Sequence, residues 1–110
     1  MNPAPGEVWT ADLGLAAKFW RVVIVSRQDA DPPRALVVYV PVTSQNRGSK
    51  YEVVISNVRF FDEGSVANVQ GIGSLPRVRL GRKLGRLPTA TMKEIKHAIR
   101  WALELAEDEE

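Results

Sequence analysis

The sequence of 110 residues predicts a mainly β fold, a small barrel with one amphipathic helix packed at its side. Several short runs rich in β-branched and aromatic residues are separated by turns that contain Gly, Pro or Asp. After Thr89 the apolar residues change from the spacing of strands to that of a helix. The length suits a single domain over residues 1–110, large enough to fold without disulfides.

The first three strands are predicted in the N-terminal half. Residues 6–13 alternate weakly in polarity after a Pro-Gly entry. Residues 19–26 are apolar except for Arg21 and Ser26, and their β-branched and aromatic content favours a strand over a helix. A turn over residues 28–33 then leads into the strand 34–43, whose apolar centre is typical of a strand buried on both faces.

The next strands are shorter and more polar. Residues 51–56 are predicted to form a hairpin with the strand 34–43, across the link 44–50. Residues 65–70 predict another strand. The basic segment 75–87, which glycines interrupt, is expected to supply one or two more.

The chain ends in a predicted amphipathic helix. Thr91 and Glu94 have the spacing of a capping box, which predicts the helix start. Trp101, next to the apolar face, is expected to pack or to lie at an interface, and His97 is expected at the surface. The apolar positions at helical spacing are Met92, Ile95, Ile99, Ala102, Leu103 and Ala106.

Composition excludes several kinds of chemistry. There is no Cys, so neither disulfides nor thiolate metal sites can form, and His97 is the single histidine. We therefore expect no metal and no cofactor. No stretch is long and apolar enough to span a membrane, and the first residues do not resemble a signal peptide, so we expect a cytoplasmic protein with no membrane contact.

The charge is unevenly distributed. The net charge is +2, but residues 107–110 form an acidic tail, so the rest of the chain is more basic than this number indicates. Arginines and lysines are dense between Arg77 and Arg86, which suits contact with phosphates and is also common on solvated strands.

An unusually polar stretch follows the strand 34–43 directly. Thr43 and Ser44 place hydroxyls at the strand end, and Gln45, Asn46 and Arg47 follow, with Lys50 just beyond. This arrangement suits an anionic ligand that accepts hydrogen bonds. A solvated turn would use some of the same residues, so the pattern alone leaves both possibilities open.

Five blocks of sequence follow one another along the chain: PGEVW with DLG, RALVVYVPVTSQNRGSKYEV, GSVANVQ, RKLGRL and TMKEIKHAIRWALEL. In this order they resemble the PemK/MazF family of toxins from bacterial toxin–antitoxin pairs. The likeness runs from about residue 5 to residue 105. It implies an SH3-like barrel, a homodimer, and metal-independent endoribonuclease activity on single-stranded RNA that inhibits growth and is silenced by a cognate antitoxin protein.

The resemblance also assigns catalytic residues. The family's threonine, after a Pro-x-Thr at a strand end, corresponds to Thr43. The family's arginine lies six residues before a strand-ending serine. Counted back from Ser26, this position is occupied by Trp20, and Arg21 follows it. A bulge near Phe19 and Trp20 would turn Arg21 into the groove. We therefore expect Arg21 to stabilise the charge on the phosphate and Thr43 to donate a hydrogen bond to it.

A wider set of residues is expected to bind RNA around these two. Basic and amide side chains suit the phosphates, and Trp20 offers a face on which a base can stack. The candidates are Lys18, Trp20, Ser44, Gln45, Asn46, Arg47, Lys50, Gln70, Arg77 and Arg79.

A different class of function fits the same fold. Gyrase poisons that share this barrel bind a protein through their terminal helix, and Trp101 lies near the end of the helix predicted here. A catalytically degenerate module that only binds a partner protein is a further alternative.

Overall fold

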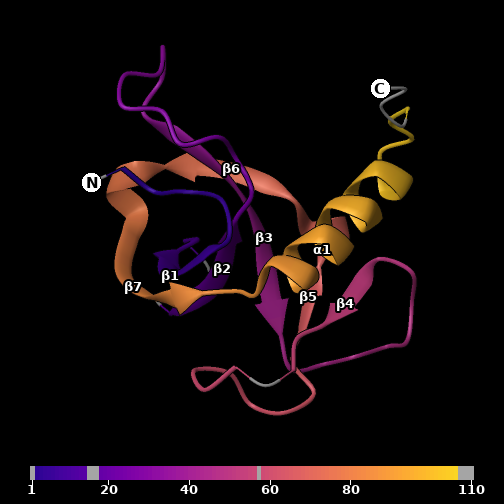
Figure 1. The fold of residues 1–110 in the computed structure, drawn as a ribbon. Coiled ribbons are helices and arrows are strands. Elements are labelled where there is room, and N and C mark those ends of the chain that lie inside the picture. Colours follow the sequence, from indigo (N-terminus) through magenta and orange to yellow (C-terminus); the bar gives the residue numbers. More distant parts are fainter. Residues whose placement is uncertain (1, 15–17, 57, 107–110) are drawn as a thin grey trace.

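The computed structural model describes residues 2–14, 18–56 and 58–106. Strands of a curled antiparallel sheet surround the core, and one helix lies across its side (Figure 1). The predicted SH3-like barrel with a C-terminal helix is confirmed. In chain order the elements are β1 (Glu7–Asp12), β2 (Phe19–Ile24), β3 (Leu36–Thr43), β4 (Glu52–Val54), β5 (Val66–Asn68), η1 (Val69–Gly71), β6 (Gly73–Pro76), η2 (Arg77–Arg79), β7 (Leu80–Arg86) and α1 (Thr89–Ala102).

Strand β3 is the centre of the sheet. The strand order is β4-β5-β3-β2-β1-β7, and β6 also pairs with β3. The first half of β3 pairs with β6, from Leu36 opposite Pro76 to Tyr39 opposite Gly73. Its last two residues, Val42 and Thr43, pair with β5 instead. The end of β3 therefore lies where two parts of the sheet separate.

The predicted hairpin between β3 and β4 is wrong, because β5 lies between them. Ala67 of β5 pairs with Val42 on one side and with Val53 on the other. The link 44–50 does not form a ladder with β3, since its backbone N–H groups at Arg47 and Ser49 bind the side chain of Glu52. The link thus folds onto the start of β4 and leaves room for β5.

Two other boundaries differ from the sequence prediction. The strand expected over residues 65–70 ends at Asn68, because the Asn68 side chain accepts the Gln70 N–H at 3.1 Å and starts the short helix η1. The basic segment 75–87 forms the end of β6, the short helix η2 and the strand β7. It therefore supplies one long strand besides the last residues of another.

The helix is amphipathic as predicted, but the capping box is wrong. Its N-cap is Pro88, whose side chain cannot accept a hydrogen bond, and α1 begins at Thr89, before Thr91. The fixed φ of proline suits entry into a helix. Met92 and Ile95 are buried against the sheet. No helix in the described part of the chain is long and apolar enough to cross a membrane.

The core has two clusters, on opposite faces of β2. Val23 belongs to a cluster that includes the buried side of α1, whereas Val22 and Ile24 belong to a second cluster with Leu80. Successive side chains of a strand point to opposite faces. Trp20 therefore shares a face with Val22, and the next residue takes the face of Val23.

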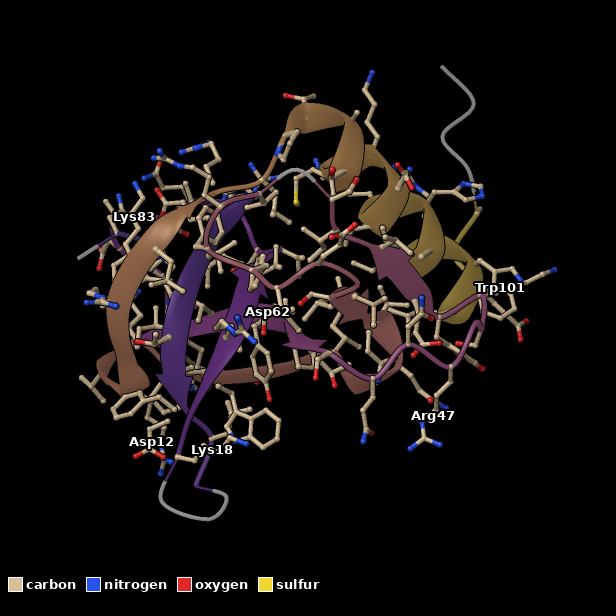
Figure 2. All side chains as sticks on the ribbon, turned by 90° about the horizontal axis from the view of Figure 1, so that it is seen from below. Asp12, Lys18, Arg47, Asp62, Lys83 and Trp101 are labelled. Atoms are coloured by element: carbon tan, nitrogen blue, oxygen red, sulfur yellow. The ribbon has the colours of Figure 1, made fainter. Side chains whose placement is uncertain are left out.

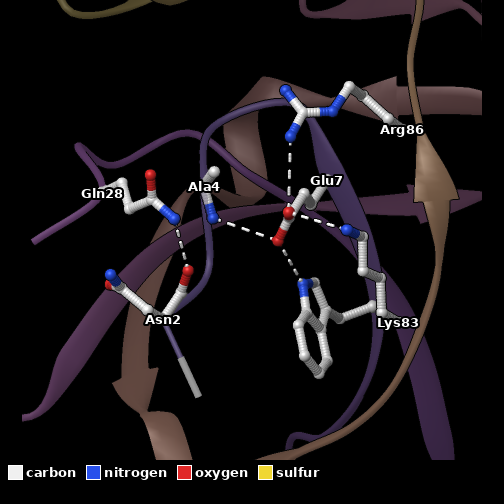
Figure 3. Close-up of polar contacts among 7 residues, drawn as sticks. Asn2, Ala4, Glu7, Gln28, Lys83 and Arg86 are labelled. Atoms are coloured by element: carbon white, nitrogen blue, oxygen red, sulfur yellow. Dashed lines mark hydrogen bonds and ion pairs between the residues drawn. The ribbon is translucent and has the colours of Figure 1, made fainter. Parts of the chain in front are cut away.

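A buried carboxylate ties the N-terminal segment to β7 (Figure 3). Glu7 is only 6% exposed and accepts hydrogen bonds from the Ala4 N–H and the Trp9 Nε1, both at 3.1 Å. It also pairs with Lys83 at 3.0 Å and Arg86 at 3.4 Å. Burial alone raises the pKa of Glu7, but the Ala4 N–H and Lys83 outweigh it and hold the pKa below the ordinary 4.5.

Candidate nucleic-acid interface

A groove of about 540 Å³ opens at the end of β3. It lies where β3 leaves β6 and meets β5, between the start of β2 and the loop 44–50. Most of its lining side chains can donate or accept hydrogen bonds. The lining residues are Trp20, Pro41, Val42, Thr43, Gln45, Arg47, Ser49, Tyr51, Glu52, Asn68 and Gln70.

Thr43 has a defined hydrogen-bonding state in this groove. It is half-buried as the last residue of β3. Its Oγ1 accepts the Gln45 N–H at 3.1 Å. A hydroxyl that already accepts one bond keeps its O–H to donate. Thr43 can therefore donate a hydrogen bond to a ligand in the groove.

The loop 44–50 is ordered by bonds to its own backbone. The carboxylate of Glu52 accepts the Ser49 N–H and hydroxyl, both at 2.9 Å, and the Arg47 N–H at 3.1 Å. The pKa of Glu52 is lowered, because the N–H groups of Ser49 and Arg47 stabilise its charged form. The Asn46 Oδ1 accepts the Gly48 N–H at 2.8 Å, and Gly48 has a φ of +71°. These hydrogen bonds therefore hold the backbone of the loop at the rim of the groove.

Trp20 forms an aromatic wall of the groove, and a cation lies beside it. The ammonium of Lys18 is 4.6 Å from the centroid of the Trp20 ring. The Trp20 Nε1 is buried and makes no hydrogen bond within the described part of the chain. Figure 2 shows Lys18 and Arg47 toward the same edge of the molecule, on different parts of the chain. Aromatic and positive groups thus flank the groove.

The bulge expected near Phe19 and Trp20 is wrong, and Arg21 does not line this groove. The register between β1 and β2 is continuous from Val8 opposite Val23 to Asp12 opposite Phe19. The Arg21 Nη1 donates to the Phe60 carbonyl at 3.5 Å, and its guanidinium lies 5.0 Å from the Phe61 ring centroid. Without a bulge, Arg21 takes the face opposite to Trp20. The structure therefore does not bring Arg21 and Thr43 together.

The other candidates divide between the groove and its surroundings. Gln45, Arg47 and Gln70 line the groove with Trp20 and Thr43. Ser44 and Asn46 belong to the same exposed loop but are not part of the lining.

The remaining basic candidates lie against other parts of the surface. Lys50 points toward α1, with its ammonium 5.7 Å from the Trp101 ring centroid. Arg77 donates to the Asp29 carbonyl at 2.6 Å, beyond the opposite end of β3. Arg79 lies next to Gly14 after β1. The acidic tail 107–110 lies outside the described residues.

Sequence reasoning missed several residues of the groove. Asn68 lines it but was not singled out, because β5 was not expected to lie between β3 and β4. Glu52 was missed as the acceptor that closes the loop. A carboxylate three residues after Ser49 in a polar loop was the available signal, since such side chains often accept nearby backbone N–H groups.

Few of the side chains that line the groove are charged. Among its described lining residues, Arg47 is the one basic side chain and Glu52 is the one carboxylate. No three His, Asp or Glu side chains of the described residues gather where they could hold a metal ion. The groove can therefore offer a hydroxyl, amides, aromatic faces and one guanidinium to a ligand.

The fold and the groove define a class of protein: an SH3-like barrel with a C-terminal helix and a polar groove at its strand ends. The profile of a family described as "PemK-like, MazF-like toxin of type II toxin-antitoxin system" matches residues 4–103. The chain belongs to this toxin family. The expected family membership is confirmed.

The chain is similar to several members of known function class. It is 34% identical to "Probable endoribonuclease MazF5" of Mycobacterium tuberculosis (strain ATCC 25618 / H37Rv), over 96% of this chain and 94% of that relative. The structure of a mycobacterial "Endoribonuclease in complex with its cognate antitoxin" matches with a TM-score of 0.83, 31% identity and coverage of 96% and 99%. "Mycobacterium tuberculosis toxin MazF-mt6" matches with a TM-score of 0.80, 27% identity and coverage of 92% and 99%.

Proposed function

We propose that this protein is the toxin of a type II toxin–antitoxin pair and acts as an endoribonuclease on single-stranded RNA in the cytoplasm. The groove at the end of β3 is the observation that carries the proposal. It combines the donor hydroxyl of Thr43, the aromatic wall of Trp20 and the guanidinium of Arg47 in one open site. Single-stranded RNA is bound by stacking and by phosphate contacts of these kinds.

The endoribonuclease proposal is favoured over the protein-binding alternatives. The relative that is 34% identical and the structure that is 31% identical are both named endoribonucleases. A gyrase-poison-like protein would act through its terminal helix and would need no polar groove at the strand ends. The groove and the relatives' names therefore support the same activity.

The activity is proposed to be independent of metal. The described residues offer no cluster of metal-ligating side chains, and the ribose 2′-hydroxyl can attack its own phosphate without a metal. The protein then needs only to align the two groups and to stabilise the charge that develops on the phosphoryl oxygens.

Two partners are part of the proposal. A homodimer would cover exposed apolar side chains such as Leu36, Val38 and Leu105. A cognate antitoxin would bind and silence the toxin, and the related mycobacterial structure contains an endoribonuclease in complex with its cognate antitoxin. The family and the exposed apolar surface support the homodimer, and the family and the related complex support the antitoxin.

Cleavage of a long single-stranded transcript tests the proposed function. The purified protein is incubated with the transcript, with and without EDTA, and cut sites are mapped by primer extension. We expect cuts at a short recurring motif, equal rates with the chelator, and no cuts when the motif is in a duplex. A protein that cuts no RNA under these conditions would contradict the proposal.

A further inference from the structure

The groove lacks the strand arginine that the sequence suggested for catalysis. Arg21 faces Phe61 on the other side of β2, and Trp20 takes its place beside Thr43. Cleavage of RNA requires positive charge or hydrogen-bond donors where the phosphoryl oxygens gain negative charge. Arg47 is the one basic side chain among the described residues that line the groove.

The backbone of Arg47 is held in place although its side chain is exposed. Its N–H donates to both oxygens of Glu52, at 3.2 and 3.1 Å. Ser49 donates its N–H and its hydroxyl to the same carboxylate. Three donors from two residues of one loop thus converge on Glu52. The Arg47 Nη2 is 3.5 Å from the Gln45 Oε1, and Figure 2 shows Arg47 projecting from the loop.

We propose that Arg47 is the catalytic cation of this groove and that Glu52 is a positioning residue that fixes the backbone of Arg47. The inference rests on the proposed endoribonuclease function. A guanidinium can donate two parallel N–H bonds to two phosphate oxygens, which a lysine ammonium cannot do with the same geometry. The side chain reaches the phosphate from the rim, while Thr43 donates from the end of β3.

The reaction is an internal phosphoryl transfer. The ribose 2′-oxygen forms a bond to the adjacent phosphorus, and the bond from phosphorus to the 5′-oxygen of the next nucleotide breaks. The 2′-hydroxyl loses its proton to water, and the leaving 5′-oxygen takes a proton from water. The products are a 2′,3′-cyclic phosphate and a 5′-hydroxyl. Arg47 and Thr43 donate hydrogen bonds to the phosphoryl oxygens during this step.

Lys18 is the competing cation. Its ammonium lies over the ring of Trp20 and not in the groove lining. A cation in this place favours binding of a phosphate next to a base that stacks on Trp20. We therefore expect Lys18 to affect RNA affinity and Arg47 to affect the rate of the chemical step.

The test measures affinity and chemistry separately. A short RNA that carries the mapped cut site is cleaved under single-turnover conditions with the protein at saturating concentration. The variants are Arg47→Gln, Arg47→Lys and the matched control Arg34→Gln, which removes the same charge beyond the other end of β3. We expect Arg47→Gln to slow cleavage about a hundredfold or more, while its dissociation constant for RNA rises less than about tenfold.

The two remaining variants test whether the guanidinium geometry and the position of the charge matter for the cleavage rate. Arg47→Lys should recover no more than about a tenth of the parent rate, because the fork of two donors is lost. Arg34→Gln should cleave at the parent rate. All three variants should keep the parent's thermal unfolding midpoint, because each replaces an exposed side chain and leaves the Arg47 N–H bond to Glu52 intact.

A double-mutant cycle tests the positioning role of Glu52. Glu52→Gln should slow the step about tenfold by loosening the loop. If Glu52 acts through Arg47, the variant with both changes should be no slower than Arg47→Gln alone. If the double variant is instead slowed by the product of the two single effects, Glu52 acts on the RNA directly. That result would overturn its positioning role.

Two results would contradict this inference, and they can be told apart. If the parent protein cuts RNA and folded Arg47→Gln cuts it equally fast at saturation, Arg47 is not the catalytic cation, even if affinity falls. If the parent protein cuts no RNA at all, the proposed function itself is wrong, and this inference is lost with it.

Discussion

Trp20 of β2 and Thr43 of β3 line the same groove, although the residue next to Trp20 faces away from it. The ladder between the two strands runs from Ile24 opposite Tyr39 to Val22 opposite Pro41. Continued by two residues, this register places Trp20 opposite Thr43. The groove therefore holds the Trp20 indole together with the Thr43 hydroxyl, whereas the sequence suggested the Arg21 guanidinium together with that hydroxyl.

Replacing Trp20 by Ala should weaken RNA binding. The loss of a stacking face costs about 1–3 kcal/mol per base, which corresponds to an affinity lower by about 5- to 150-fold. Trp20→Phe should retain most of the affinity because it keeps an aromatic face. Fluorescence anisotropy with a labelled single-stranded RNA measures both.

Phe19 provides the matched control for Trp20. It is the preceding residue of β2, 62% exposed, and not part of the groove lining. Phe19→Ala should change RNA affinity by less than about twofold. Equal losses for Phe19→Ala and Trp20→Ala would place stacking outside the groove.

Replacing Thr43 by Val should slow RNA cleavage about a hundredfold. The change keeps the shape of the side chain and removes the O–H that can donate to the phosphate, and a lost donor of this kind typically costs this much. Thr43→Ser keeps the hydroxyl and should stay within about tenfold of the parent rate. Single-turnover cleavage, with thermal unfolding as the folding control, decides between these results.

Replacing Arg21 by Ala should affect stability more than cleavage. The change removes the guanidinium that lies over Phe61, a contact worth about 1 kcal/mol. The unfolding midpoint should fall by about 4–8 °C, and the folded variant should cleave within about threefold of the parent rate. A hundredfold slower rate in folded Arg21→Ala would return the catalytic role to this residue.

Acid should destabilise the fold through Glu7. The folded-state pKa of Glu7 lies below the unfolded value of 4.5, so the unfolded chain takes up this proton first as pH falls. The stabilisation is present above pH 4.5 and is lost as pH falls through the folded-state pKa. Urea unfolding between pH 3 and pH 7 should show the free energy of unfolding decreasing in this window.

Glu7→Gln is the variant that isolates this contribution. It keeps the shape but weakens the bonds to Ala4, Trp9 and Lys83, at a cost of about 1–3 kcal/mol at neutral pH. Its stability should depend less on pH below 4.5 than that of the parent. An unchanged pH dependence would show that other carboxylates control acid unfolding.

RNA affinity should depend steeply on salt, with a slope of about −0.7 in log affinity against log salt for each phosphate contact. Lys18→Gln should make the slope shallower by about one contact if its ammonium binds a phosphate beside Trp20. An unchanged slope would make Lys18 part of the stacking surface only. Titrations at several salt concentrations measure this directly.

The sequence by itself determined the local features of this protein. Apolar patterns identified the first three strands and the helix, because the spacing of buried residues is a property of each element alone. The polar run after β3 marked Thr43, Gln45 and Arg47, which the groove does bring together. The order of five weak motifs also indicated the family that the profile match confirms.

The tertiary structure alone decided which residues face one another. The placement of β5 beside β3 brought Asn68 into the groove, and the capture of the 44–50 loop by Glu52 fixed Arg47 at its rim. The unbroken register of β2 turned Arg21 toward Phe61. These outcomes depend on pairing between distant segments, and a shift of one residue exchanges the two faces of a strand, so no local pattern could determine them.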